Sequence, residues 1–182
     1  MNNFLETERL LIRIETAEEY KQLFETRTNA ELREHFNLTN ESLEVQKWKV
    51  KNSMTTYRMS FRMFHLIEKE SKKIIGDFAF HNWFAMHSRS EIGYGMKSDE
   101  FKNKGFLKEA LKVIIPYGFE GMKLNRMEAI IGLENIASQK AVLGVGFVLE
   151  AVLKEHYCEN GIIEDSLVYR LLRSEHDKMN NL

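Results

Sequence analysis

The residues that could do chemistry gather in a Lys-rich segment between a predicted strand and a predicted helix, Lys97–Leu107. Within it, Lys102 and Lys104 precede a single glycine, Gly105. A strand, a glycine loop and a helix start favour an anion site, because first-turn N–H groups lack helical partners and the helix dipole attracts negative charge. Glycine lets an anion approach the backbone closely, and the lysines add positive charge. A solvated loop with a glycine near a helix start is the alternative.

Other motifs for catalysis or metal binding are absent from the sequence. The loop has neither the GxxxxGK[ST] pattern of P-loop proteins nor the GxGxxG pattern of dinucleotide-binding folds. HExxH, CxxC and GxSxG do not occur, and the six histidines lack metal-ligand spacing. We interpret His65 and His81 as ordinary strand residues and Cys158 as a spare thiol. No metal site is therefore expected.

The composition is that of a globular protein without a strong overall charge. The chain has 182 residues, a formal net charge of −1 and 43% hydrophobic residues. This length predicts one domain over residues 1–182, with a core at about 5–172. The near-zero charge disfavours a general nucleic-acid binder, which must neutralise phosphates. One cysteine, no apolar run of roughly 20 residues and no secretory signal predict a cytoplasmic protein that does not enter membranes.

Hydrophobic periodicity predicts early helices, then an antiparallel meander, then alternating strands and helices. Strands are predicted at residues 9–14, 61–70, 74–83, 91–96, 126–133, 146–157 and 163–172. Helices are predicted after a capping Thr16 and at residues 29–36, 41–57, 106–115 and 137–145. Pro116 should kink or stop the fourth helix near Ile115, because proline has no N–H to donate. Residues 176–182 should form a loose end. This order predicts one α/β (α+β) sheet of about seven strands with helices on both faces.

Landmark segments occur in order between residues 5 and 172: TERLLIR, IGDFAFHNW, EIGYGM, FKNKGFLKEAL, YGFEGMKLNRMEAIIGLENIAS, GFVLE and EDSLVYRLL. Together they resemble the GNAT superfamily of N-acetyltransferases and, within it, the ribosomal-protein N-terminal (RimJ/RimL-type) branch. The resemblance implies a mixed, mostly antiparallel sheet whose middle strands splay apart. It also implies acetyl transfer from acetyl-CoA to a primary amine, by direct attack in a ternary complex.

The resemblance also assigns residues to the cosubstrate acetyl-CoA. The family's pyrophosphate loop, Q/R-x-x-G-x-G/A, falls on residues 102–107, which agrees with the anion site inferred above. Lys102 replaces the usual Arg or Gln, and Leu107 replaces the small last residue and should narrow the groove. The assigned residues are Met96, Lys97, Lys102, Asn103, Lys104, Gly105, Phe106, Leu107, Asn135 and Ser138.

The segment after Asn135 departs from the family pattern. Asn135, in N-x-A-S, matches the asparagine that meets the pantetheine arm. The tyrosine expected seven residues later is absent, since Val142 stands there, and the following Glu-Lys of the branch is replaced by Leu143-Gly144. These changes leave an alternative function open, namely a CoA-binding module with little or no catalytic activity.

The catalytic roles follow from the needs of amide formation together with the resemblance. Glu91 is the hypothesised base, acting through water, and a strand-edge carboxylate paired with Arg89 or another basic residue is the alternative. Main-chain N–H groups around Met96 and Lys97 are the expected oxyanion donors. Ser138 is expected to hydrogen-bond the leaving sulfur, or else only to support the start of its helix.

The acceptor is expected to be a protein N-terminal amine or a small amine. In the family, the early helices and the last two strands read the acceptor, which correspond here to residues 28–57 and 153–165. Four acidic residues near the closing hairpin could attract a cationic amine or form a solvated charged surface: Glu155, Glu159, Glu164 and Asp165. A homodimer is a family-level expectation.

Overall fold

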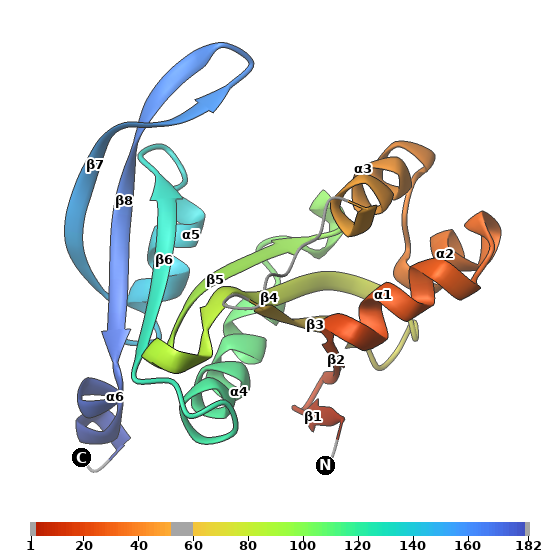
Figure 1. The fold of residues 1–182 in the computed structure, drawn as a ribbon. Coiled ribbons are helices and arrows are strands. Elements are labelled where there is room, and N and C mark those ends of the chain that lie inside the picture. The colour runs from red at the N-terminus through yellow and green to blue at the C-terminus, as the bar shows by residue number, and fades with distance from the viewer. Residues whose placement is uncertain (1–2, 52–59, 181–182) are drawn as a thin grey trace.

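The computed structural model describes residues 3–51 and 60–180, which form one eight-stranded sheet and six α-helices (Figure 1). The strands are β1 (Phe4–Glu6), β2 (Leu10–Thr16), β3 (Ser60–Glu68), β4 (Ile74–Phe84), β5 (Arg89–Met96), β6 (Arg126–Gly132), β7 (Val148–Glu159) and β8 (Ile162–Leu172). The helices are α1 (Ala17–Thr26), α2 (Asn29–Phe36), α3 (Asn40–Lys51), α4 (Phe106–Glu120), α5 (Ile136–Leu143) and α6 (Arg173–Asn180), with short 3₁₀ segments at Ala85–His87 and Asp99–Phe101.

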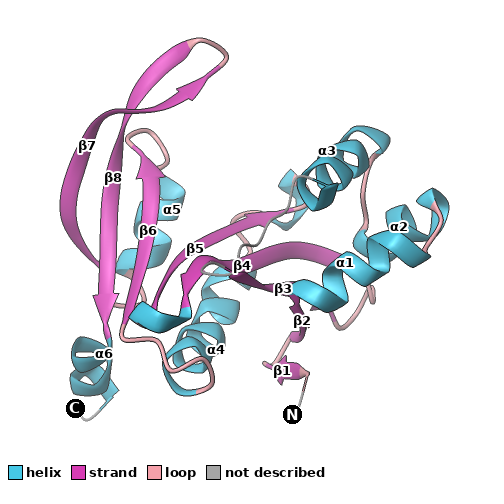
Figure 2. Ribbon diagram, viewed as in Figure 1, coloured by secondary structure: helices cyan, strands magenta, loops and turns pink. Residues whose placement is uncertain are grey.

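The sheet consists of two antiparallel halves joined by one parallel pair. The strand order is β1-β2-β3-β4-β5-β6-β8-β7, and only β5 and β6 run parallel. Figure 2 shows these halves leaning apart, with β7 and β8 extending beyond the rest. The expected mostly antiparallel sheet is confirmed, and the three-residue β1, too short to show a periodicity, raises the number of strands from seven to eight.

Each face of the sheet has its own hydrophobic core, so helices do cover both faces as predicted. On one face, α4 contributes Leu111, Ile114 and Phe119, which are fully buried against residues such as Phe64 and Phe80 of the sheet. The residues buried on the other face, under α1, α2 and α3, are Ala17, Tyr20, Leu32, Phe36, Leu43, Phe61 and Ile74. Alternating side chains on β3 and β4 supply both cores, as expected for strands covered on two sides.

The starts of the first two helices follow local sequence rules. Thr16 and Thr28 each accept a hydrogen bond from the backbone N–H three residues later, and the Glu19 and Glu31 carboxylates accept one from the backbone N–H of each cap residue. The predicted α3 is confirmed as far as Lys51, and its predicted continuation to residue 57 lies outside the described residues. No helix in the described ranges is long and apolar enough to cross a membrane.

Of the predicted kink or stop of the fourth helix near Ile115, the stop is wrong. Helix α4 continues through Pro116 to Glu120. Proline removes one helical hydrogen bond, but the last turn carries Phe119, which is fully buried in the core between α4 and the sheet. Burying a phenylalanine is worth about 1.5–3 kcal/mol, which offsets the lost bond.

The predicted loose end at residues 176–182 is also wrong for the part that the structure describes. Helix α6 packs back onto the body of the protein, where the ring of His176 lies 4.8 Å from that of Phe119. The Arg173 guanidinium donates to the carbonyl of Leu124 at 2.8 Å, and Glu175 pairs with Arg170. The contacts with Phe119 and Leu124 join residues far apart in the sequence, so polarity alone could not reveal them.

A row of buried charges crosses the sheet on the face covered by α1 and α2. The His65 ring contacts Asp77 at 2.7 Å and Glu15 at 3.0 Å, and Asp77 also pairs with Lys97. Burial alone would lower the pKa of His65, but its hydrogen bonds to Asp77 and Glu15 outweigh burial and raise it. Burial alone would raise the pKa values of Glu15 and Asp77, yet His65 holds both below their usual range. Each charge in the row therefore stabilises its neighbours.

Replacing His65 by leucine should destabilise the protein by about 3–5 kcal/mol, because it leaves Glu15 and Asp77 buried without their shared cation. His65, with its raised pKa, stabilises the fold most fully below about pH 6.5, the ordinary histidine value, and loses this effect as pH rises through the folded-state pKa. Urea unfolding at pH 6 measures the loss. As a control, Lys154→Ala, which breaks an exposed pair with Asp165, should cost at most about 1 kcal/mol. Equal losses in the two variants would contradict a stabilising role for the row.

Candidate active site

The two parallel strands at the centre of the sheet pair over only a short length. Arg89–Glu91 of β5 lies in register with Arg126–Glu128 of β6, and beyond this point the strands diverge (Figure 1). A cavity of about 740 Å³ lies beside the end of β5, between the starts of α4 and α5. The expected splay of the middle strands is therefore present, and it creates a site.

Cations and helix starts dominate the lining of this cavity. Its lining residues are Tyr94, Gly95, Met96, Phe101, Lys102, Asn103, Gly105, Phe106, Leu107, Lys108, Asn135, Ala137, Ser138, Lys140, Ala141 and Gly144. Three of them are lysines, and none is an aspartate or glutamate. The positive ends of two helix dipoles add to the lysine charges. The cavity therefore suits a polyanion.

The loop before α4 exposes backbone donors to the cavity. Asn103 and Gly105 both have left-handed backbone conformations, with φ of 58° and 81°. Gly105 begins the helix without a side-chain cap, and the first helical bond runs from the Glu109 N–H to its carbonyl. The N–H groups of the first three helical residues, 106–108, therefore have no partner within the helix. Glycine adopts this φ without the steric cost that a Cβ imposes.

Arg9, on the neighbouring β1–β2 segment, holds this loop in place. Its Nε donates to Glu109 at 2.7 Å and its Nη1 donates to the Lys104 carbonyl at 3.2 Å. The guanidinium also lies 4.5 Å from the ring centroid of Phe106. The loop conformation therefore depends on a residue almost a hundred positions away in the sequence.

Most residues assigned to acetyl-CoA line the cavity, but Lys97 and Lys104 do not. The Lys97 N–H donates to the Ile75 carbonyl at 2.8 Å, so it is not available as an oxyanion donor and that expectation is corrected. Successive N–H groups of a strand point in opposite directions, so the Met96 N–H faces the gap beyond β5. Lys102 lines the cavity while its Nζ lies 2.6 Å from Asp99, whose pKa it lowers through a hydrogen bond and its charge.

The start of α5 brings together Asn135, Ser138 and a residue that sequence reasoning missed. The Asn135 side chain caps the helix by accepting from the Ser138 N–H at 3.1 Å. The Tyr94 hydroxyl, from β5, donates to the Ser138 carbonyl at 3.2 Å. Burial raises the pKa of Tyr94, although its hydrogen bond to Ser138 opposes that rise. Tyr94 thus places a protonated phenol in the cavity, where the family's usual tyrosine is missing.

The predicted base, Glu91, lies where β5 and β6 are still paired, at the narrow end of the gap. It does not pair with Arg89, which lies near Glu128 and over the Phe84 ring. Instead, Glu91 accepts from Asn82 at 2.9 Å, and its Oε1 lies 3.8 Å from Nε2 of His81. His81 faces Glu91 directly across β4 and β5.

His81 is more than the ordinary strand residue that the sequence indicated. Its ring lies against the backbone of Gly93, where an added Cβ would approach Nε2 to 2.9 Å. Burial lowers its pKa, the charge of Lys49 lowers it further, and Glu91 opposes both. A lowered pKa keeps the imidazole neutral at neutral pH and able to accept a proton. Direct pairing of a strand histidine with a strand glutamate follows only from the register of the two strands.

Comparison with known proteins identifies the family. The family described as "Acetyltransferase (GNAT) domain" matches residues 9–148. The chain is 31% identical over 171 residues to the "Uncharacterized N-acetyltransferase YoaA" of Bacillus subtilis (strain 168), covering 93% of this chain and 96% of that protein. The chain belongs to the GNAT family of acetyltransferases.

Two further comparisons agree with this assignment. The chain is 24% identical over 136 residues to the "Ribosomal-protein-serine acetyltransferase" of Escherichia coli (strain K12), covering 74% of this chain and 75% of that protein. A crystal structure of an acetyltransferase of the GNAT family from Bacillus anthracis superposes with a TM-score of 0.67 at 26% identity, covering 94% of this chain and 99% of that one. The resemblance inferred from the sequence is confirmed.

The GNAT pattern fits this cavity except at α5. Val142, which occupies the position of the family's tyrosine, is fully buried in the core and presents no group to the cavity. Leu107 packs partly against the same core while lining the cavity. Within the described residues, no group of three or more His, Cys, Asp or Glu could hold a metal ion.

Replacing Arg9 by glutamine should loosen the loop before α4 without unfolding the protein. Arg9 is partly exposed, so its ion pair and hydrogen bonds should stabilise the loop by only about 1 kcal/mol. Hydrogen exchange of the amides at 103–108 should therefore accelerate roughly fivefold. Lys21→Gln, which removes an exposed α1 cation paired with Glu25, is the control and should leave these amides unchanged. Unchanged exchange in the Arg9 variant would show that Arg9 does not hold the loop.

Proposed function

We propose that this GNAT protein is an acetyl-CoA-dependent N-acetyltransferase that acetylates a primary amine by direct attack in a ternary complex. The observation that supports this most strongly is the cavity beside the β5–β6 gap, where two helix starts and three lysines meet without a carboxylate. A pyrophosphate carries the charge and the acceptor oxygens that such a site satisfies. The proposed donor is therefore a nucleotide thioester bound by its pyrophosphate.

The loop at 102–107 would hold the pyrophosphate mainly through its backbone. The N–H groups at the start of α4 lack helical partners, and Gly105 leaves room for an anion. Lys102 would exchange its exposed partner Asp99 for a phosphate oxygen, at little cost because the pair is solvated. Lys102 therefore supplies the positive charge that an arginine would supply at this position and that a glutamine would not.

Backbone and side-chain donors further into the gap would bind the thioester end. The Met96 N–H faces the gap and would donate to the oxyanion that forms when the amine attacks. The side-chain amide oxygen of Asn135 accepts from the Ser138 N–H, which leaves the side-chain NH₂ of Asn135 to donate to the pantetheine arm.

Glu91 and His81 are proposed to accept the proton of the attacking amine, through water. The two side chains face each other, and the lowered pKa of His81 leaves its ring free to take a proton at neutral pH. Glu91 would then stabilise the imidazolium, because an adjacent carboxylate favours the charged form. Both side chains lie on the sheet face that carries α1–α3, so the amine would approach from there.

The leaving thiolate would be stabilised by hydroxyl groups rather than by the family's tyrosine. Ser138 and Tyr94 both line the cavity, and the Tyr94 hydroxyl already lies 3.2 Å from the Ser138 carbonyl. A phenol is a stronger acid than a serine hydroxyl, so Tyr94 would donate the proton while Ser138 hydrogen-bonds the sulfur. This supply of a phenol from β5 counters the view that loss of the α5 tyrosine disables catalysis.

The acceptor is proposed to be a protein N-terminal amine or a small primary amine. One relative is named for acetylating a ribosomal protein, which favours the protein N-terminus. The acidic residues of the closing hairpin contribute unequally, since Asp165 already binds Lys154 and the Glu155 N–H, whereas Glu159 and Glu164 are exposed. The exposed pair remains available to attract a cationic acceptor.

Isothermal titration with acetyl-CoA tests the proposed function. We expect binding in the micromolar range, abolished by Gly105→Glu and weakened by Lys102→Ala. The glutamate would bring negative charge and a Cβ to a backbone position with φ of 81°. Release of free thiol from acetyl-CoA in the presence of peptides or small amines then measures turnover. Binding without turnover would support the CoA-binding module instead, and no binding up to millimolar acetyl-CoA would refute both functions.

Glu91→Gln should lower kcat on the order of 100-fold, the usual scale for loss of a general base. Acetyl-CoA affinity should change little, because Glu91 does not line the cavity. Steady-state kinetics at saturating acetyl-CoA, with titration of the same variant, separate the two effects.

The matched control for this variant is Glu128→Gln. Glu128 lies in register with Glu91 on the adjacent strand and is bound by Arg126 at 2.6 Å. Its kcat should stay within about threefold of the parent, which is under 1 kcal/mol of barrier. In the parent, protonation of His81 should lower kcat at a pH below the ordinary histidine value of about 6.5, and His81→Gln should remove this acid limb. Equal effects of the Glu91 and Glu128 changes would mean that Glu91 is not the base.

A further inference from the structure

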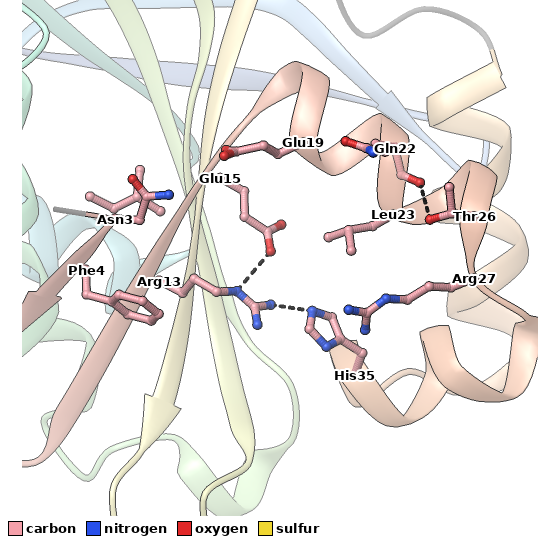
Figure 3. Close-up of a pocket in the computed structure, with 11 residues that line it drawn as sticks. Asn3, Phe4, Arg13, Glu15, Glu19, Gln22, Leu23, Thr26, Arg27 and His35 are labelled. Carbon is pink, nitrogen blue, oxygen red and sulfur yellow. Dashed lines mark hydrogen bonds and ion pairs between the residues drawn. The ribbon is translucent and has the colours of Figure 1, made fainter. Parts of the chain in front are cut away.

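A second cavity, of about 520 Å³, lies between β2, α1 and α2 (Figure 3). It shares no lining residue with the cavity beside the β5–β6 gap. No step of the proposed transfer uses it.

Two guanidinium groups converge on His35 in this cavity. Nη2 of Arg13 lies 2.7 Å from Nε2 of His35. Figure 3 shows Arg27 reaching toward the same ring from the opposite side. Because an arginine can only donate, Nε2 must accept, and the imidazole is neutral. Burial and the charges of Arg13 and Arg27 agree with this, since they lower the pKa of His35 to about 4.

The carboxylates in this cavity are already committed to other partners. Glu15 is buried, and its two oxygens contact Arg13 at 2.9 Å and His65 at 3.0 Å. The Glu19 carboxylate accepts from the Thr16 N–H and caps α1. Within the described residues, Arg27 makes no ion pair. No carboxylate that lines this cavity is therefore paired with Arg27, and outside it hydrogen bonds from Thr28 and then the charge of Arg27 lower the pKa of the exposed Glu31.

The positive field continues on the far side of His35. Arg13 and His35 also line a neighbouring hollow of about 530 Å³, together with Arg33, Lys72 and Lys73. Glu34 is the single carboxylate among its lining residues. Clefts lined by one sign of charge concentrate ions of the opposite sign. This hollow therefore attracts anions toward Arg13 and His35 from the far side of the first cavity.

We infer that the cavity between β2, α1 and α2 is a binding site for a small molecule carrying a carboxylate or phosphate group, bound by the guanidinium groups of Arg13 and Arg27 that flank His35. Planar guanidinium forks match both oxyanions. The Phe4 and Leu23 side chains provide apolar walls for the rest of the ligand. The inference does not depend on the proposed acetyl transfer, because the two cavities share no residue.

Titration with succinate and with inorganic phosphate tests this site, using sodium chloride at matched ionic strength as the blank. Amide chemical shifts on α1 and α2 should change with the anion, and they report this site separately from the shifts at the start of α4, where the proposed pyrophosphate site lies. The anion that binds with the higher affinity identifies the ligand group as carboxylate or phosphate. Arg27→Gln should weaken its binding at least tenfold without loss of stability, since Arg27 is exposed and makes no ion pair in the described structure.

Two control variants each remove one positive charge that lies outside the lining of this cavity. Lys21→Gln changes an exposed α1 cation that pairs with Glu25, and Lys108→Gln changes a cation of the other cavity. Both should bind the anion as the parent does. The inference is overturned if neither anion binds above the chloride blank, if Arg27→Gln binds as the parent does, or if Lys108→Gln weakens binding as much as Arg27→Gln.

Discussion

The brief pairing of β5 with β6 is the constraint on which the rest of the site depends. Parallel strands normally satisfy each other's N–H and carbonyl groups along their length. Here three residues of each strand pair before the strands separate. The Met96 N–H is consequently left facing a gap, and the two helices that follow β5 and β6 begin at its rim. Backbone donors, helix dipoles and lysines thus meet in one cavity because one ladder stops early.

Such a gap needs two rigid sides, and each half of the sheet has its own means of staying rigid. On the β1–β5 side, His65 lies between two carboxylates while Lys97 and Arg13 neutralise the outer ends of the row. Across the gap, the Tyr94 hydroxyl reaches α5, and the α4 core includes buried residues from both halves, such as Phe80 and Met127. The halves are therefore joined through side chains where the backbone ladder is missing.

The sequence predicted the features that depend on near neighbours. Alternation identified β3, β4 and β5, the capping Thr16 located α1, and Gly105 marked the loop before α4. Prediction from the sequence failed where contacts between residues far apart in the chain determine the structure. The buried Phe119 carries α4 past Pro116, and contacts of α6 with Phe119 and Leu124 order the C-terminal segment. The same limit applies to the site. The pairing of β4 with β5 places the Lys97 N–H in a hydrogen bond to Ile75 and brings His81 next to Glu91, and neither contact can be predicted from residues near in sequence.

The net charge of −1 conceals two clusters of cations with different chemistry. The cations of the cavity beside the β5–β6 gap are lysines. A lysine is a point charge on a flexible side chain, and an exposed pair such as Lys102–Asp99 can exchange one partner for another at little cost. Its geometric selectivity must therefore come from the fixed N–H groups of α4. Between β2 and α2 the cations are arginines, and Arg13 is oriented by Glu15 and His35. Selectivity there would reside in the side chains themselves, which is why substitution of one guanidinium should matter more than loss of one lysine.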